Sequence, residues 1–225
     1  MSRSPIIAID GPAASGKGTI ARRLAAHYDF AHLDTGLLYR AVGILADERG
    51  LNEEARMRDF SEDPHFVNLI LAEMQTPLVR TDNAAQMASK VAAIPVVRAA
   101  LLKFQQDFCA MPPDGKKGAV LDGRDIGTVI APAADVKIFV TAGIEFRAQR
   151  RWKELQNLAL QAGVEAATET AVLAEMKERD ARDASRSIAP AKLAPDAVIL
   201  DTSTMTADEA FTAALKIAEG KLPRL

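Results

Sequence analysis

Short apolar runs alternate with segments of helical periodicity along almost the whole chain. A buried strand of a parallel sheet reads as a continuous apolar run, whereas an amphipathic helix repeats its apolar residues every three or four positions. The pattern predicts strands at residues 6–9, 30–34, 118–123, 136–142 and 197–203. It predicts helices at residues 19–28, 36–50, about 64–74, 84–94, 96–111, 144–160, 169–185 and 206–220. Strands that alternate with helices indicate an α/β fold with a central parallel sheet covered by helices on both faces.

Composition narrows this picture without changing it. The 225 residues suffice for one α/β domain, and a formal net charge of −2 does not indicate a nucleic-acid-binding surface. Cys109 is the single cysteine, which excludes an intramolecular disulfide and fits a reducing compartment. The apolar run near the N-terminus is too short for a signal peptide, and no stretch approaches the roughly 20 apolar residues of a membrane span. We therefore expect a cytoplasmic protein without membrane association.

The strongest chemical signal is the stretch GPAASGKGT, which follows the first apolar run and opens the first predicted helix. Glycines allow a tight turn whose amides point at phosphate oxygens, and the helix from about Lys17 adds its positive dipole end and a full charge. An ordinary glycine-rich turn is the alternative, which the combination of strand, loop, lysine, hydroxyl and helix makes improbable. The predicted ATP-binding residues are Gly11, Pro12, Ala13, Ala14, Ser15, Gly16, Lys17, Gly18 and Thr19.

This loop departs from the common pattern, because Gly18 separates Lys17 from the hydroxyl of Thr19. We expect Ser15 and Thr19 to contact phosphates or their waters, so that Thr19 meets Mg²⁺ only through water. Ala14 stands where many such loops carry another glycine, which predicts a slightly stiffer loop.

Aspartates and arginines mark further candidate positions. Asp10, Asp34, Asp122 and Asp201 each lie at or just after a predicted strand end, where parallel sheets bind ligands. Aspartate also favours turns, and for Asp201 we prefer that interpretation. A single arginine is usually part of a solvated helix face, but several here lie in phosphate-transfer positions. Arg150 and Arg151 must point in different directions, so one of the two is expected to be structural.

Several segments together resemble the bacterial cytidylate (CMP) kinase family. They are IAIDGPAASGKGT, LDTGLLYRA, ASKVAAIPVVRAALL, LDGRDIGTVIAP, VKIFVTA and KERDARDASRSIAP, in the family's order and over nearly the whole chain. The resemblance implies a three-layer P-loop kinase: a single domain over residues 1–225, with an NMP-binding insert at about 35–98 and a small lid at about 147–167. It implies transfer of the γ-phosphoryl group of ATP to CMP or dCMP with Mg²⁺, by a monomer. Residues 60–88 look abbreviated, without the extra strands that the family commonly carries there.

The same resemblance assigns roles to individual residues. Arg40 and Arg124 would bind the CMP phosphate, and Arg179 and Asp183 the ribose. The cytosine would lie among Ser89, Arg98, Asp125 and Arg186. Lys17 and the lid arginines Arg147, Arg150 and Arg151 would act on the transferring phosphate. The base chemistry agrees, because a carboxylate suits the exocyclic amine of cytosine and guanidinium groups suit its N3 and O2 acceptors.

Three other functions remain open at this stage. The first is another small-molecule kinase on the same core, acting on UMP, dTMP or a shikimate-like acceptor. The second is a nucleotide-dependent switch, although no NKxD sequence of a GTPase is present. The third is an RNA-binding protein, which is disfavoured because only 5% of residues are aromatic and acids are interleaved with the arginines.

Overall fold

Five parallel strands form the central sheet of this computed structural model, which describes residues 3–51, 54–162, 167–185 and 189–222. The strands run in the order β2-β3-β1-β4-β5. Their bounds are β1 Ile6–Asp10, β2 Ala31–Asp34, β3 Ala119–Gly123, β4 Val136–Thr141 and β5 Val198–Asp201. All four pairings are parallel, and the sheet confirms the five predicted strands within a few residues at each end.

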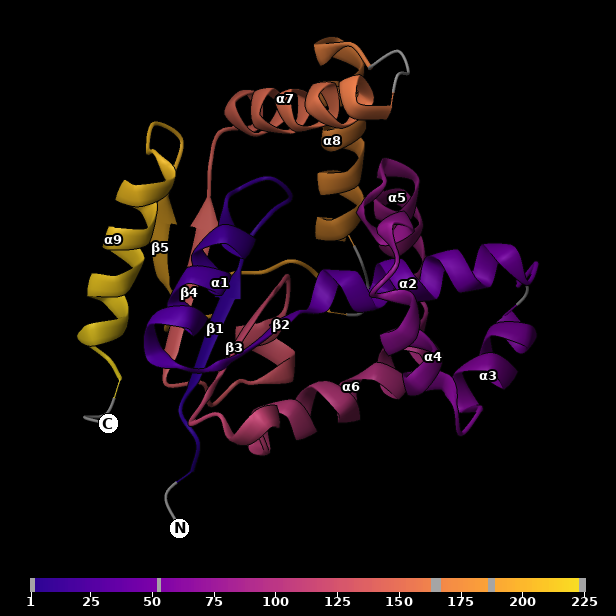
Figure 1. The fold of residues 1–225 in the computed structure, drawn as a ribbon, viewed down its shortest axis with the longest axis horizontal. Coiled ribbons are helices and arrows are strands. Elements are labelled where there is room, and N and C mark those ends of the chain that lie inside the picture. Colours follow the sequence, from indigo (N-terminus) through magenta and orange to yellow (C-terminus); the bar gives the residue numbers. More distant parts are fainter. Residues whose placement is uncertain (1–2, 52–53, 163–166, 186–188, 223–225) are drawn as a thin grey trace.

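Alternate residues of each central strand feed two separate cores, since successive side chains point to opposite faces. Ile7 and Ile9 of β1 are buried under α1 (Lys17–Tyr28) and α9 (Ala207–Glu219). Ile6 and Ala8 pack into the larger core on the opposite face, to which α2 (Thr35–Glu48) and α6 (Pro95–Ala110) contribute. The result is the predicted three-layer arrangement, with α1 and α9 on one side of the sheet in Figure 1.

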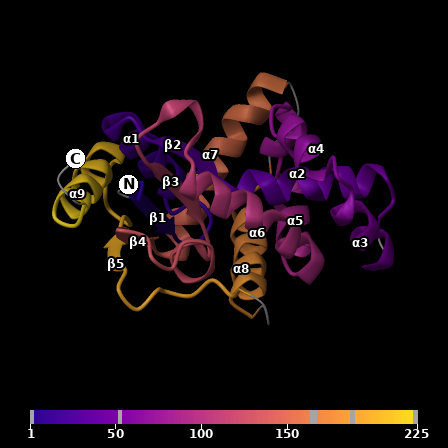
Figure 2. The same cartoon turned by 90° about the horizontal axis from the view of Figure 1, so that it is seen from below.

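Helices joined by short loops make up the described part of the chain between β2 and β3. Most of them lie on the right of Figure 1 as a lobe beside the sheet, whereas α6 runs along the bottom of the view, and Figure 2 shows the same lobe from below. Besides α2 and α6 they are α3 (Glu54–Glu62), α4 (Phe66–Glu73), α5 (Asp82–Val91) and two 3-10 turns at Pro77–Arg80 and Pro113–Gly115. No strand occurs in this lobe among the described residues, in agreement with the abbreviated insert that the sequence indicates.

Two long helices follow in the upper part of Figure 1, where the first lies across the top and the second runs downward from it. They are α7 (Ile144–Ala162), which follows β4, and α8 (Glu169–Ser185), which leads back toward the lobe. A small apolar cluster that includes Ala148, Val172 and Met176 joins them. The loop between them contains residues 163–166, which lie outside the described part of the chain, so the full predicted lid cannot be traced.

The helical segments confirm most of the predicted pattern, with one element missed. The helix expected near residues 64–74 is α4, and the break at Pro95 separates α5 from α6 as predicted. Helix α3 gave no clear signal because its polar sequence presents few apolar positions, chiefly Met57 and Phe60, to the core. Helix α5 begins earlier than expected, because the Thr81 side chain caps it by accepting a hydrogen bond from the amide of Ala84.

None of the helices in the described residues combines the length and the apolar character that crossing a lipid bilayer would require.

Candidate active site

The glycine loop connects β1 to α1 at the carboxyl end of the sheet. Gly16 stands at the N-terminus of α1 with φ +89°, in the left-handed region that glycine adopts at low cost. Its carbonyl accepts hydrogen bonds from the amides of Thr19 and Ile20, which closes the first helical turn. Thr202, the residue directly after β5, donates through Oγ1 to the carbonyl of Ser15 at 2.8 Å and so also holds the loop. The loop is thereby fixed in a shape that offers helix N-terminal amides to an anion.

Gly11 makes the closest approach to the sheet in this loop. Its φ is +151°, and a Cβ added here would lie 2.0 Å from the carbonyl oxygen of Val140 in β4. Only a residue without a side chain fits, because the obstructing atom belongs to the backbone of a central strand. The glycine at position 11 of the sequence is therefore required by the close packing of the loop against β4.

We expect Gly11→Ala to destabilise the protein by roughly 2–3 kcal/mol, because β4 or the loop must move to admit the methyl group. The matched control is Gly50→Ala, where φ is also positive, at +61°, but no atom lies within 4 Å of the added Cβ. That variant should lose only about 1 kcal/mol through backbone strain. Thermal unfolding of both variants measures the difference, and equal losses would show that the contact with Val140 is not what requires glycine.

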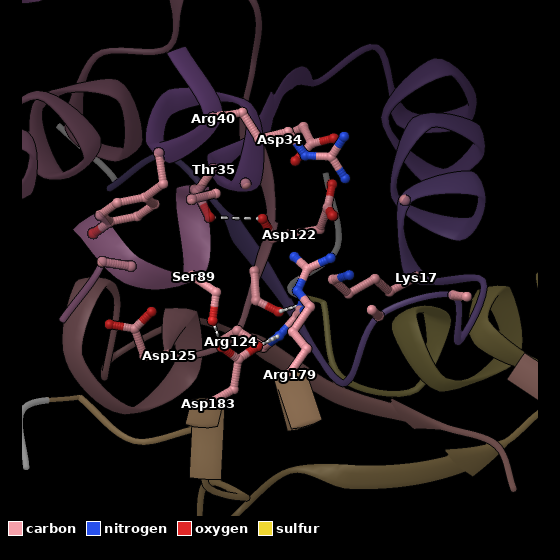
Figure 3. A pocket seen from close by; sticks show the side chains of 18 of the residues that line it. Lys17, Asp34, Thr35, Arg40, Ser89, Asp122, Arg124, Asp125, Arg179 and Asp183 are labelled. Atoms are coloured by element: carbon pink, nitrogen blue, oxygen red, sulfur yellow. Dashed lines mark hydrogen bonds and ion pairs between the residues drawn. The ribbon is translucent and has the colours of Figure 1, made fainter. Parts of the chain in front are cut away.

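A cavity opens beside this loop at the ends of β2 and β3. We call it the central cavity, and Figure 3 shows its lining side chains converging from the sheet, α2, α5 and α8. It brings together seven of the eight predicted CMP-binding residues: Arg40, Ser89, Arg98, Arg124, Asp125, Arg179 and Asp183. Lys17 lines the same cavity from the glycine loop. The eighth predicted residue, Arg186, lies outside the described residues.

One end of the central cavity is built around a buried ion pair. The guanidinium of Arg98, on α6, donates to Asp125, and both side chains are almost fully buried. The Arg98 guanidinium also lies 5.6 Å from the centre of the Tyr39 ring. A buried pair of this kind costs desolvation free energy, so its presence at a cavity wall indicates a role in recognising a ligand.

A chain of hydrogen bonds connects the cavity wall to the glycine loop. Ser89 on α5 donates to one oxygen of Asp183 at 2.8 Å, and Arg124 donates through Nε to the other oxygen at 3.1 Å. Arg124 also donates through Nη1 to the carbonyl of Gly11 at 2.8 Å. Arg124 thus links the loop to α8, and its side chain lies in the middle of Figure 3.

Cations are crowded where the cavity meets the loop. The pKa of Lys17 is lowered to about 8, chiefly by burial and next by the nearby Arg124, against the opposing effects of Asp122 and Asp34. Burial likewise lowers the pKa of Arg179 to about 9, with Arg124 as the next cause. The charged forms of these groups are destabilised in the ligand-free protein, and a bound anion would stabilise them. The electrostatics therefore favour phosphate ligands.

Two other aspartates flagged in the sequence have different roles. Asp10 is buried and accepts hydrogen bonds from the amides of Ile126 and Gly127, both at 2.8 Å, while burial raises its pKa to about 6. It holds the π-helical turn Ile126–Ile130 directly after Asp125. Asp201 is exposed and accepts from Ser203, which confirms the turn interpretation for that residue.

The three arginines predicted to act on the transferring phosphate lie in separate environments on α7. Arg147 is buried, donates to the carbonyls of Ala142 and Ala13, and pairs with Asp180 at 2.6 Å. Arg150 turns toward β5 and donates to the backbone of Thr202. Arg147 therefore stabilises the glycine loop, and Arg150 stabilises the segment that follows β5.

Arg151 turns the opposite way from Arg150, as the sequence predicts. It donates to Asp82 of α5 at 2.8 Å and to Glu154 at 2.9 Å. It lines a second cavity together with Arg40 and Arg179 of the central cavity. Of the three arginines, Arg151 is the one that lines a cavity with Arg40 and Arg179.

Eight cavity residues were not among the predicted binding residues, and four of these have polar side chains: Asp34, Thr35, Tyr39 and Asp122. Asp34 and Asp122 did carry a signal, since each ends a predicted strand, and the register places the two opposite one another. Thr35 donates through Oγ1 to the carbonyl of Asp122 at 2.9 Å, which ties the start of α2 to β3. Tyr39 follows from neither periodicity nor spacing, because its place in the cavity depends on the approach of Arg98 of α6 to its ring.

The comparison with known families decides the assignment. The family model described as cytidylate kinase matches residues 7–220. The chain belongs to the cytidylate kinase family. A protein named cytidylate kinase from Paramagnetospirillum magneticum is 54% identical over 224 residues, covering 97% of this chain and 99% of that protein. Relatives of the same name from Rhodospirillum rubrum and Caulobacter sp. are 53% and 52% identical, over 96% and 95% of this chain and 98% and 94% of their own lengths.

Membership of this family confirms the predicted fold and enzyme class. A kinase of the family acts on nucleotides, and the two anion-binding features described above, the glycine loop and the central cavity, match two phosphate-bearing substrates. The seven residues predicted to bind CMP lie in one cavity although they are spread over more than 140 positions of sequence.

Proposed function

We propose that this protein transfers the γ-phosphoryl group of ATP to CMP or dCMP, giving ADP and CDP or dCDP. The observation that supports it most is the buried pair of Arg98 and Asp125 in a cavity that opens onto Lys17 and the glycine loop. The pair offers a base both an acceptor and donors, and the loop offers a cradle for a triphosphate. Membership of the cytidylate kinase family supports the same pair of substrates.

Cytosine fits the chemistry of the cavity end better than uracil. In this proposal Asp125 accepts from the exocyclic amine, while Arg98 and Arg186 donate to N3 and O2, and Ser89 completes the base site. Uracil would present a carbonyl oxygen to the carboxylate and leave a buried acceptor unpaired, which costs a few kcal/mol. The proposed selectivity is therefore for CMP and dCMP over UMP.

The remaining charged residues of the cavity suggest where the phosphate and the ribose of CMP bind. We assign the phosphate to Arg40 and Arg124 and the ribose to Arg179 and Asp183 of α8, all of which line the central cavity. Arg124 then contacts the acceptor phosphate while it donates to the carbonyl of Gly11, so it sets the distance between acceptor and donor loop. Phosphoryl transfer depends chiefly on such positioning and on charge around the moving group.

ATP is proposed to occupy the loop and the adjoining cavity toward β5. Loop amides and Lys17 would hold the triphosphate, with Ser15 and Thr19 on its oxygens or waters. The cavity beside the loop is lined by Ile20 of α1, Met205, and Ala207 and Ala210 of α9, which form an apolar surface for adenine. Arg150 lines that cavity, and Arg151 lines both that cavity and the second cavity next to Arg40. These positions agree with the proposal that α7 closes over the transferring phosphoryl group.

We further propose Mg²⁺ as the divalent ion that accompanies ATP. Mg²⁺ keeps several waters and is usually held by one or two carboxylates together with substrate phosphates. The carboxylates of Asp34 and Asp122, opposite one another beside Lys17, suit such a hydrated ion, and Thr19 would meet it through water. The ion supplies charge neutralisation of the phosphates when bound. Among the described residues, no group of three or more His, Cys, Asp or Glu side chains is arranged to hold a metal ion.

The lobe and the α7–α8 pair are proposed as the moving parts of the enzyme. The NMP-binding insert would span about residues 35–98 and the lid about 147–167, and their closure would exclude water before transfer. The contact of Arg151 with Asp82 already joins α7 to the lobe. We also propose that the enzyme is a cytoplasmic monomer of 24.1 kDa. Its elution volume in size-exclusion chromatography tests the monomeric state.

A panel of nucleoside monophosphates tests the proposed function. ADP release is followed with ATP, Mg²⁺ and CMP, dCMP, UMP, dTMP or AMP as acceptor. The proposal expects CMP and dCMP to exceed every other acceptor in kcat/KM, UMP by about 10²-fold or more. Equal use of UMP, or a preference for dTMP or AMP, would reject it.

ATP binding should take up protons in mildly alkaline solution. Lys17 has a pKa of about 8 in the ligand-free protein, and the triphosphate charge must raise it, so protons are bound on complex formation between pH 8 and about 10. The uptake should nearly vanish at pH 6.5, where Lys17 is already charged. Calorimetry in buffers of different ionisation enthalpy measures it. The Lys17→Met variant retains only the proton uptake that comes from other groups such as Arg179. If the wild type took up no more protons on ATP binding than this variant, the assignment of the uptake to Lys17 would be wrong.

A further inference from the structure

His32 lies in β2, which is the edge strand of the sheet beside β3. In the parallel register His32 is opposite Val120, and Asp34 is opposite Asp122. Side chains two positions apart share a face of a strand, and Val120 belongs to the core under α1 and α9. His32, Asp34 and Asp122 therefore all face α1, whose first residue is Lys17.

A hydrogen bond joins His32 to Asp122 diagonally across the two strands. Nε2 of His32 is 2.9 Å from Oδ2 of Asp122, whose side chain is only 3% exposed. An ionised carboxylate only accepts hydrogen bonds, so Nε2 carries the hydrogen and donates it. The imidazole thus occupies one carboxylate oxygen and leaves the other for the active site.

The second oxygen of Asp122 faces the start of α1. A Cβ built on Gly18 would lie 3.7 Å from Oδ1, which is ordinary van der Waals contact. The backbone of Asp122 is held separately, since its carbonyl accepts from the hydroxyl of Thr35. With the backbone fixed in this way, the rotation of the carboxylate is set by what binds its oxygens, and His32 binds one of them.

Packing alone does not account for a histidine at this position. Its side chain is 21% exposed at the edge of the sheet, where a β-branched or aromatic residue would suit the strand equally well. Asp34 lies directly opposite Asp122, and repulsion between these like charges favours rotation of the two carboxylates away from each other. The hydrogen bond from His32 opposes that rotation.

We propose that His32 is a positioning residue: its Nε2 hydrogen bond holds the Asp122 carboxylate so that Oδ1 faces Lys17 and the hydrated cation that enters with ATP. This inference rests on the proposed function, because it assumes that a metal–nucleotide complex occupies the loop. Hydrogen-bond partners that orient a metal-facing carboxylate typically contribute a factor of 10–100 to metal affinity or activity. His32 would act entirely through Asp122, without touching either nucleotide.

Two amide variants separate positioning from a general structural effect. Gln places its Nε2 near the position of the histidine Nε2, whereas Asn is too short to reach Asp122. The affinity of a non-hydrolysable ATP analogue is measured by calorimetry with and without Mg²⁺, and kcat is measured with CMP. We expect His32→Asn to lose about tenfold of the Mg²⁺-dependent gain in affinity and about tenfold in kcat. The metal-free affinity and the KM for CMP should stay unchanged, and His32→Gln should recover most of both losses.

Two results would overturn this inference. One is a His32→Asn protein whose Mg²⁺-dependent gain equals that of the wild type, and the other is a His32→Gln protein impaired as much as His32→Asn. His65→Asn, at the exposed start of α4, serves as the matched control. Failure of the wild type to phosphorylate CMP would reject the proposed function instead, while the calorimetric comparison would still test His32.

Discussion

Lys17→Met should lower kcat for transfer from ATP to CMP by roughly 10³-fold, because it removes the full charge at the developing phosphoryl group and leaves the rest of the site in place. CMP affinity should change little, since the base and phosphate contacts of the central cavity come from other residues. The unfolding temperature should not fall. Burial lowers the pKa of Lys17 to about 8, so charging this lysine opposes folding at neutral pH, and its removal costs no stability.

Lys103→Met is the matched control for this variant. Lys103 is exposed on α6 and pairs with Asp107 within its own helix, so the same loss of charge should leave kcat within twofold of the wild type. Stopped-time assays of ADP and CDP formation measure both proteins. A Lys17→Met enzyme with near-normal kcat would remove Lys17 from the proposed catalytic group.

Asp125→Asn should lower kcat/KM for CMP by about 10²-fold or more while leaving ATP affinity unchanged. The change puts an amide where the exocyclic amine of cytosine needs an acceptor, and it leaves the buried Arg98 without its charged partner. Uracil carries a carbonyl at that position and accepts from an amide. The ratio of kcat/KM for CMP to that for UMP should therefore fall steeply, which a general loss of structure would not produce.

Asp201→Asn provides the same chemical change at the end of β5. Its carboxylate is exposed and only closes a turn with Ser203, so both nucleotides should be used as in the wild type. Initial rates with CMP and UMP, together with calorimetric ATP binding, complete the comparison. If Asp125→Asn weakened ATP and CMP equally, Asp125 would not belong to a cytosine site.

The fold follows from the sequence wherever apolar residues form long or strongly periodic runs. The apolar runs that became β1, β3 and β4 identify central strands buried on both faces, and Pro95 correctly ends one helix before the next. Helix α3 was missed because a short, polar helix is stabilised by tertiary packing of few residues, here Met57 and Phe60, and not by a pattern of its own.

The site follows from the sequence only in part. Gly11, Gly16 and Lys17 were predicted because the phosphate loop is continuous in sequence, and the strand-end aspartates because parallel strands end at one edge. The cytosine end was predicted through family resemblance, since Ser89, Arg98 and Asp125 come from three separate elements. No spacing rule reveals the contact of Tyr39 with Arg98 or the bond from His32 to Asp122, because both depend on how neighbouring elements pack in space.

The most direct test is a crystal structure of the protein with CMP bound. The account predicts the base beside Arg98 and Asp125, with the amine of cytosine on the carboxylate, and the phosphate between Arg40 and Arg124, directed toward Lys17. A CMP molecule bound outside the central cavity, or with its base at the glycine loop and its phosphate at Asp125, would contradict it.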